Sequence, residues 1–214
     1  MVCPRNMERL DTHFDDSFMI LSRRIAWLLG NWVTRIPSDC RPAVYQILLK
    51  LMDDNDIVVQ LTAAQGLTQV IDDMNFDIQP FSAYVPAALQ SLLALATKSQ
   101  EVSTKMQLIN HLAVIIEQSH SQVQPFVPQI VAFLSQLWIA PTDDQGMMRS
   151  AIIRSIEKLV SVLEHRSAEY YGSLIPLVKT ATDVSQPDSI YTLEDGMNVW
   201  LSLCRYFLLT QFRY

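Results

Sequence analysis

The chain has 214 residues, half of them hydrophobic, which is enough for one large domain or two small ones and argues against disorder. Only five glycines are present, too few for a β-rich fold with many tight turns. The net charge of −6 and the pI of about 5.1 are the reverse of the balance that phosphate binding requires, so we expect no nucleic-acid partner. An acidic surface suits a basic protein partner instead.

The cysteine count and the hydropathy pattern indicate the compartment. Cys3, Cys40 and Cys204 are far apart and odd in number, which argues against a disulfide framework and fits a reducing compartment. The N-terminal residues have no apolar core of the signal-peptide type. Two long stretches without charge, residues 78–97 and 118–142, are interrupted by Gln, Ser and Pro, so we expect no membrane span.

The first predicted helix contains the stretch SRRIAWLLGNWV, residues 22–33. Its apolar residues recur with the 3.6-residue period of an α-helix and form one stripe: Ile25, Leu28, Leu29, Trp32, Val33 and Ile36. We expect this stripe to face the core and the helix to end before Pro37. Arg23, Arg24 and Trp27 lie off the stripe and are left with an outward role.

Four later segments repeat this apolar period, and we call all five predicted helices first-class helices. Their stripes are Val59, Ala63, Gly66, Leu67, Val70 and Ile71; Val102, Met106, Ile109, Ala113 and Ile116; Met148, Ala151, Ile152, Leu159 and Leu163; and Ile190, Leu193, Met197, Trp200 and Cys204. Aspartates gather between the helices, several near helix starts, where a carboxylate caps free backbone N–H groups.

A second class of helix lies between the first-class helices and shows an internal repeat. Its segments are RPAVYQILLKLM, VPAALQSLLALA, VPQIVAFLSQLW and a weaker IPLVKTA. Their aligned prolines, Pro42, Pro86, Pro128 and Pro176, are 44, 42 and 48 residues apart, and we expect each in a first helical turn. A period in the forties with two helices per unit is typical of HEAT or armadillo repeats. The scarcity of glycine favours HEAT, because an armadillo unit adds a short third helix, usually after a glycine.

We therefore predict an all-α fold, an α-solenoid of HEAT repeats with about four helix pairs plus one further helix. The expected boundaries are a divergent segment at 1–18, the repeat array at 19–208 and a tail at 209–214. The second-class helices carry almost no charge, as expected where each repeat packs on two neighbours. The apolar ends of such an array predict association or aggregation of the isolated chain.

No pattern in the sequence predicts an enzyme, a metal site or a cofactor site. The four histidines show no metal-ligand spacing, and we interpret His111 and His120 as structural or solvated. Residues 53–56, Asp-Asp-Asn-Asp, resemble the start of an EF-hand loop but lack its later Gly and Glu, so they predict a turn with an N-cap. Candidate partner contacts are therefore Arg23, Arg24 and Trp27, for which a solvated or packed helix face is the alternative.

Three stretches resemble a known family. SRRIAWLLGNWV is similar to an arginine-led W-L-x-G-x-W helix of nuclear transport receptors, the karyopherin-β (importin-β) superfamily. Cys40-Arg-Pro42 and the run Asp54-Asn-Asp-Ile-Val-Val59 follow in the same order as in those receptors. The most specific match is TDVSQPDSIYTLEDGMNVWL, residues 182–201, which is similar to a segment of one import receptor of that superfamily.

The resemblance covers about residues 20–201 and implies a segment from the middle of a HEAT-repeat import receptor. Such receptors bind cargo proteins in the cytoplasm, cross the nuclear pore through weak contacts with Phe-Gly nucleoporins, and release cargo in the nucleus when Ran-GTP binds. They are several times longer, so we expect this segment to lack the main Ran-binding repeats. The alternatives are a generic HEAT scaffold for protein–protein interaction, which needs only the repeat, and an enzyme, for which no site is visible.

Overall fold

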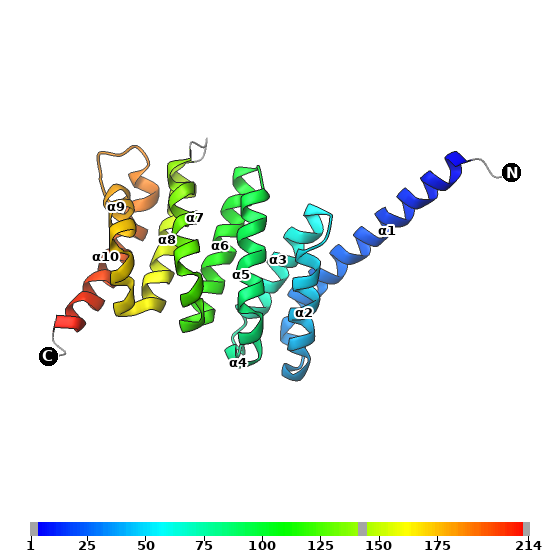
Figure 1. Ribbon diagram of the computed structural model, residues 1–214, viewed down its shortest axis with the longest axis horizontal. Helices are drawn as coiled ribbons and strands as arrows, with labels where there is room; N and C mark the ends of the chain where they lie inside the picture. Colours follow the sequence, from blue (N-terminus) through cyan, green and yellow to red (C-terminus); the bar gives the residue numbers. More distant parts are fainter. Residues whose placement is uncertain (1–3, 141–144, 212–214) are drawn as a thin grey trace. The chain divides into compact units, whose positions relative to one another are not determined.

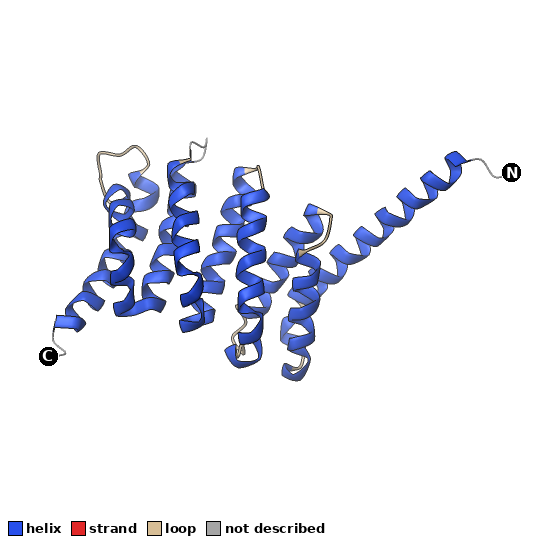
Figure 2. Ribbon diagram, viewed as in Figure 1, coloured by secondary structure: helices blue, strands red, loops and turns tan. Residues whose placement is uncertain are grey.

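The computed structural model describes residues 4–140 and 145–211, and their side chains for 18–140 and 145–206. Every regular element in these ranges is a helix, as Figure 2 shows. The chain divides into two compact units, Met1–Tyr84 and Val85–Tyr214, which are described separately. The all-α fold predicted from the sequence is confirmed, whereas the boundaries expected at residues 18 and 208 stay predictions.

The helices alternate along the chain between the two predicted classes (Figure 1). The first unit holds α1 (Pro4–Asn31), α2 (Arg41–Met52), α3 (Ile57–Ile71) and the short α4 (Ile78–Phe81), with the 3-10 helices η1 (Val33–Arg35), η2 (Ser38–Cys40) and η3 (Ser82–Tyr84). The second unit holds α5 (Val85–Lys98), α6 (Val102–Ser119), α7 (Val127–Ile139), α8 (Gln145–Leu163), α9 (Tyr171–Ala181) and α10 (Ser189–Gln211), with η4 (His120–Phe126) and η5 (Glu164–Tyr170). Within the described ranges this order gives the four pairs and one further helix that the sequence predicted, and adds α4, which it did not predict.

The helices of the second unit form two layers. The first-class helices α6, α8 and α10 pack side by side, with α8 between the other two. The second-class helices α5, α7 and α9 form the other layer, in which α7 packs on α9. In the first unit, α1 packs along α3 in the same first-class relation, and α2 packs on α3. This stacking of helix pairs is the architecture of a solenoid repeat, in agreement with the prediction.

Two turns of the second unit reproduce the repeat in backbone detail. His120 and Glu164, 44 residues apart, follow the first-class helices α6 and α8 and have φ of 48° and 51°. Each opens a seven-residue 3-10 helix that leads into the next second-class helix. Non-glycine residues rarely adopt positive φ. The same unusual turn therefore recurs at equivalent positions of two repeats, after the first-class helix of each.

Three of the four aligned prolines lie where the sequence placed them. Pro42, Pro86 and Pro128 occupy the first turns of α2, α5 and α7, where the missing N–H costs no hydrogen bond. The prediction for Pro176 is wrong, because this residue lies inside α9, which begins five residues earlier at Tyr171. The repeat with the weaker sequence similarity thus also differs in where its second-class helix begins.

The aspartate-rich turns cap helices, as expected. The Asp56 carboxylate accepts hydrogen bonds from the backbone N–H groups of Val58 and Val59 at 2.8 and 3.0 Å and starts α3. Asp77 caps α4 by accepting from Gln79 N at 3.0 Å. The prediction that residues 53–56 form a turn with an N-cap is therefore confirmed.

The apolar stripes of the helices inside the array form its core. All six stripe residues of α3 and all five of α8 are buried. In α6, Ile109, Ala113 and Ile116 are buried, whereas Val102 and Met106 at the start of the helix are half-buried. The 3.6-residue period therefore identified the core correctly on α3, on α8 and on α6 beyond its first turns.

The prediction that the stripe of α1 faces the core is wrong. Ile25 and Leu28 are exposed, and Trp32 is 61% exposed. Among the described side chains of this helix, from residue 18 onward, the buried ones are Ser22, Ala26 and Gly30, which follow one another at intervals of four residues. The helix also ends at Asn31 rather than before Pro37, because Asn31, Trp32, Val33 and Thr34 are weak helix formers and the chain continues as 3-10 helix η1.

Small residues face α3 because the two helices approach closely. A Cβ atom added to Gly66 of α3 would lie 2.9 Å from the carbonyl oxygen of Ala26, and one added to Gly30 would lie 2.7 Å from Gly66 Cα. A side chain at either position would collide with backbone, which cannot move aside alone. The contact between α1 and α3 therefore rests on glycine and alanine, and the bulky residues of α1 are turned to other faces.

The stripe predicted on α10 is also exposed. Ile190 is 79% exposed, and Leu193, Met197 and Cys204 are exposed as well, while Trp200 is half-buried. The face of α10 that packs inward carries Thr192, Gly196, Val199 and Leu203. Small residues thus lie on the inward faces of both helices, Ala26 and Gly30 on α1 and Gly196 on α10. In both cases the apolar period selected the outward face, which carries more of the large apolar residues.

A buried ion pair joins α2 to the turn after α3. Arg41 Nη2 donates to Asp73 Oδ2 at 2.5 Å and Arg41 Nη1 donates to the carbonyl oxygen of Asn75 at 3.2 Å. Both charged side chains are more than nine-tenths buried. One helical turn further along α2, Tyr45 packs edge-on against Phe81 of α4, with ring centroids 4.9 Å apart, and burial raises the pKa of its hydroxyl.

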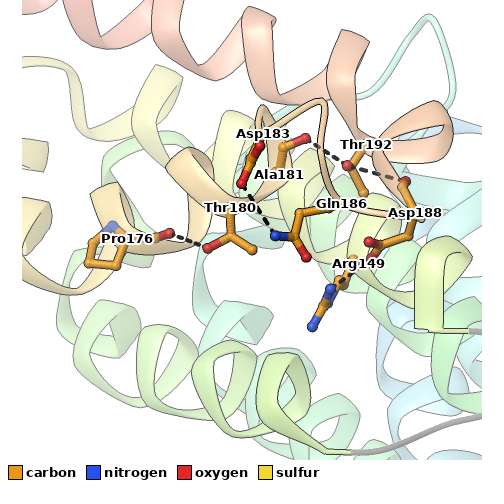
Figure 3. A network of polar contacts seen from close by, with 8 residues as sticks. All are labelled: Arg149, Pro176, Thr180, Ala181, Asp183, Gln186, Asp188 and Thr192. Atoms are coloured by element: carbon orange, nitrogen blue, oxygen red, sulfur yellow. Dashed lines mark hydrogen bonds and ion pairs between the residues drawn. The ribbon is translucent and has the colours of Figure 1, made fainter.

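The loop between α9 and α10 is held by polar contacts (Figure 3). Asp183 accepts a hydrogen bond from Gln186 Nε2, and Thr192 Oγ1 donates to the Ala181 carbonyl oxygen at 2.7 Å. Arg149 of α8 donates to Asp188 Oδ2 at 2.8 Å, and its guanidinium lies 4.9 Å above the Trp138 ring. The segment 182–201, which carries the most specific resemblance, therefore fixes α10 to its neighbours and has a structural role.

The half-buried position of His111 in α6 predicts a loss of stability in acid. Desolvation lowers the pKa of His111 to about 4, against about 6.5 for the unfolded chain. Between about pH 6.5 and pH 4 the imidazole of the unfolded chain is protonated, whereas that of the folded protein stays neutral. The free energy of unfolding therefore falls as the pH drops through this range, by about 2 kcal/mol for a partly screened ring. Urea unfolding of the wild type and His111→Gln across this range measures the difference. An equal slope for both would contradict the prediction, and His165→Gln, at an exposed histidine, is the control.

Candidate partner-binding site

The three residues predicted to face outward on α1 line one surface pocket. Arg23, Arg24 and Trp27 form it together with Ile20 of the same helix and Thr62 and Gln65 of α3. The pocket has a volume of about 330 Å³ and lies wholly within the first unit. Trp27 is 48% exposed, so its indole is partly packed and partly available. We call this pocket the α1–α3 groove.

The charged side chains that line the α1–α3 groove are both positive. Among the described side chains, neither Arg23 nor Arg24 forms an ion pair, whereas Arg41, Arg149, Arg154 and Lys158 all do. Thr62 donates its hydroxyl hydrogen to the carbonyl oxygen of Val58 at 2.7 Å. The groove therefore presents two guanidinium groups beside apolar surface and offers no carboxylate to neutralise them.

Two further grooves lie in the second unit, one in each layer. The first-class groove, of about 330 Å³, lies between α6 and α8 and is lined by Met106, Met147, Ser150 and Arg154, with Tyr191 of α10 at its edge. The second-class groove, of about 600 Å³, lies between α5 and α7; Leu93, Ala94, Ala132 and Phe133 line it beside three glutamines, a threonine and Lys98. Both grooves are mixed apolar and polar surfaces suited to weak peptide contacts.

The apolar period did not identify the residues that line these two grooves. Met106 lies on a predicted core stripe but is half-buried, and Met147, which is 47% exposed, directly precedes the stripe residue Met148. Met147 and Tyr191 each lie next to a predicted stripe residue, Met148 and Ile190, and this position was the available signal. The pairing of α6 with α8 could not be obtained from either helix alone.

No metal-binding group is assembled in the part of the chain that the structure describes. Among the side chains that the structure describes, in residues 18–140 and 145–206, no three His, Cys, Asp or Glu residues are placed to hold a metal ion. Cys40 and Cys204 are exposed and free, in line with the predicted lack of a disulfide framework. No helix in the described residues 4–140 and 145–211 has the length and hydropathy needed to cross a membrane.

Comparison with known proteins identifies relatives along most of the chain. Residues 150–209 match a family profile described as importin-11-like, TPR repeats. The chain is 35% identical to human importin-11 over 182 residues, which is 85% of this chain. It is 27% identical over 198 residues to the importin beta-like protein KAP120 of Saccharomyces cerevisiae, and 23% identical over 192 residues to kap113 of Schizosaccharomyces pombe.

The similarity covers a part of each relative. The chain spans 19% of the length of human importin-11 and of each of the two yeast proteins. TPR and HEAT repeats are both antiparallel helix pairs stacked into solenoids, so the description of the family profile agrees with the observed fold. The proline spacing of 42 to 48 residues is closer to the HEAT period than to the 34 residues of a TPR unit.

Proposed function

We propose that this chain, a homologue of a segment of importin-11 over 85% of its length, is part of a nuclear transport receptor. In this function it contributes solenoid surface to the binding of cargo proteins and Phe-Gly nucleoporins and shuttles between cytoplasm and nucleus. The main contacts with Ran-GTP would lie in other repeats of the full-length receptor. The observation that carries the proposal is the similarity to importin-11 and to two importin beta-like proteins along the same stretch.

The first-class groove is the surface that we assign to Phe-Gly contacts. Met106, Met147 and Tyr191 offer polarisable apolar walls that suit a phenylalanine ring, since sulfur and aromatic groups attract each other favourably. Polar side chains such as Ser150 interrupt this surface, so only a weak contact is expected. Weak binding agrees with the proposed role, because a receptor crossing the pore must release each repeat quickly.

A pulldown tests the proposed function. The chain should retain a Phe-Gly repeat peptide weakly, bind a matched Ser-Gly peptide less, and bind GTP-locked Ran little or not at all. Met147→Glu should reduce Phe-Gly retention at least fivefold, because a desolvated carboxylate replaces an apolar wall. Met74→Glu is the matched control, since Met74 is 98% exposed and outside the groove.

Two outcomes would count against this proposal. Equal retention of the Phe-Gly and Ser-Gly peptides would leave the chain a generic helical scaffold, the alternative that needs only the repeat. Equal loss in Met147→Glu and Met74→Glu would show that the first-class groove is not the binding surface. The similar proteins are named as importins, which gives no support to an enzymatic role.

A further inference from the structure

We propose that the α1–α3 groove binds an acidic peptide segment that carries an apolar or aromatic side chain next to its carboxylates. Arg23 and Arg24 would hold the carboxylates, and Trp27 with Ile20 would cover the apolar side chain. The inference rests on the proposed function and deepens it, since it gives the chemistry of one segment that the receptor would bind. The groove would thus bind an acidic segment, whereas the acidic remainder of the chain suits basic partners.

The first argument is that both guanidinium groups lack an acidic neighbour among the side chains that the structure describes. Every position three or four residues before or after Arg23 and Arg24 carries Met, Ile, Leu, Ala or Trp, so no helical ion pair can form. Across the groove, α3 contributes Thr62 and Gln65, which are neutral. In a chain with 22 acidic and 16 basic residues, two adjacent arginines without a counter-charge form a local positive site.

The second argument is the fit between donors and walls. An arginine binds a carboxylate through two parallel N–H···O bonds, and the exposed Gln65 amide adds a further donor. The Thr62 hydroxyl cannot donate to a ligand while it donates to the Val58 carbonyl oxygen. The arginines therefore provide the main contacts to the anion. The half-exposed Trp27 ring offers a flat apolar face beside them.

The third argument is that the groove is preformed. Gly30 and Gly66 let the backbones of α1 and α3 approach until an added Cβ atom would collide, and this fixes the spacing of the two walls. A ligand entering a fixed groove loses less free energy to ordering of the protein. The same packing means that the groove residues can be substituted on the surface without disturbing the contact below them.

The charge pattern favours a peptide over a nucleic acid. A nucleic acid needs a row of cations along its backbone, whereas the groove offers two in a chain of net charge −6. A compact pocket of about 330 Å³ with one aromatic wall matches a short linear segment of a folded or disordered partner.

Fluorescence anisotropy tests the inference with a fluorescein-labelled peptide in which a central Phe is flanked by glutamates. The whole 214-residue chain should bind it, and the affinity should fall as salt is added. Arg23→Glu combined with Arg24→Glu should weaken binding at least tenfold, and Trp27→Ala about fivefold. Arg35→Glu is the matched control, because Arg35 is an exposed arginine of the same unit outside the groove.

Each other outcome would overturn the inference. No binding of the peptide by the wild-type chain would do so directly. An equal loss with Arg35→Glu, or equal binding of a short single-stranded DNA, would show attraction of any polyanion. A peptide with lysines in place of the glutamates should not bind. Phe-Gly retention should be unchanged in the arginine variants, so a failure here is distinguishable from a failure of the proposed transport function.

Discussion

Asp73→Ala is expected to destabilise the first unit by about 3–5 kcal/mol. The substitution leaves the Arg41 guanidinium nine-tenths buried without its counter-ion, which it contacts at 2.5 Å. Arg41 Nε already lacks a hydrogen-bond partner, so the remaining contact to the Asn75 carbonyl oxygen cannot compensate. Urea unfolding followed by circular dichroism measures the loss.

Two controls separate the buried charge from other effects of the substitution. Replacing both partners by apolar residues, Arg41→Met with Asp73→Leu, should recover most of the lost stability, because no unpaired charge is then buried. Glu117→Ala removes the partner of Lys158 in an exposed pair and should cost less than about 1 kcal/mol. A cost below 1 kcal/mol for Asp73→Ala would mean that water reaches Arg41 and that the pair contributes little.

The Arg41–Asp73 pair illustrates which structural features the sequence could predict. The helix starts were predictable because capping is local: Asp56 and Asp77 contact backbone N–H groups two or three residues away. The ion pair joins residues 32 positions apart, and in the sequence Asp73 is one of several aspartates in a turn. Its partner depends on how α2 lies against α3, which no local pattern contains.

The apolar period identified the core face of some helices and failed on others. It finds the largest apolar stripe of a helix, and inside the array this stripe is the core, as on α8. On α1 and α10 the neighbouring helix is reached by small residues, Ala26 and Gly30 on α1 and Gly196 on α10, so the large stripe is exposed. The prediction of an outward Trp27 depended only on its position beside that stripe, and the α1–α3 groove needed α3 to complete it.

The exposed stripe of α10 predicts that the isolated chain associates. Ile190, Leu193, Met197 and Leu201 lie at intervals of three and four residues and are all exposed. Burying such a side chain stabilises a contact by about 1.5–3 kcal/mol. A contact that covers two or more of them therefore offsets much of the free-energy cost of association. Static light scattering at increasing concentration should therefore give an average mass above that of one 24.4 kDa chain.

Met197→Glu combined with Leu201→Glu should weaken this association at least tenfold, because each carboxylate must be desolvated in the contact. The matched control is Gln46→Glu with Asn198→Glu, which adds the same charge at exposed polar positions. If both double variants reduce the mass equally, net charge rather than the stripe governs association. A wild-type chain that stays monomeric at every concentration would show instead that the stripe of α10 is tolerated in water. The large residues would then have to act in binding a partner other than a second copy, because a solenoid helix gains nothing in stability from apolar side chains left exposed.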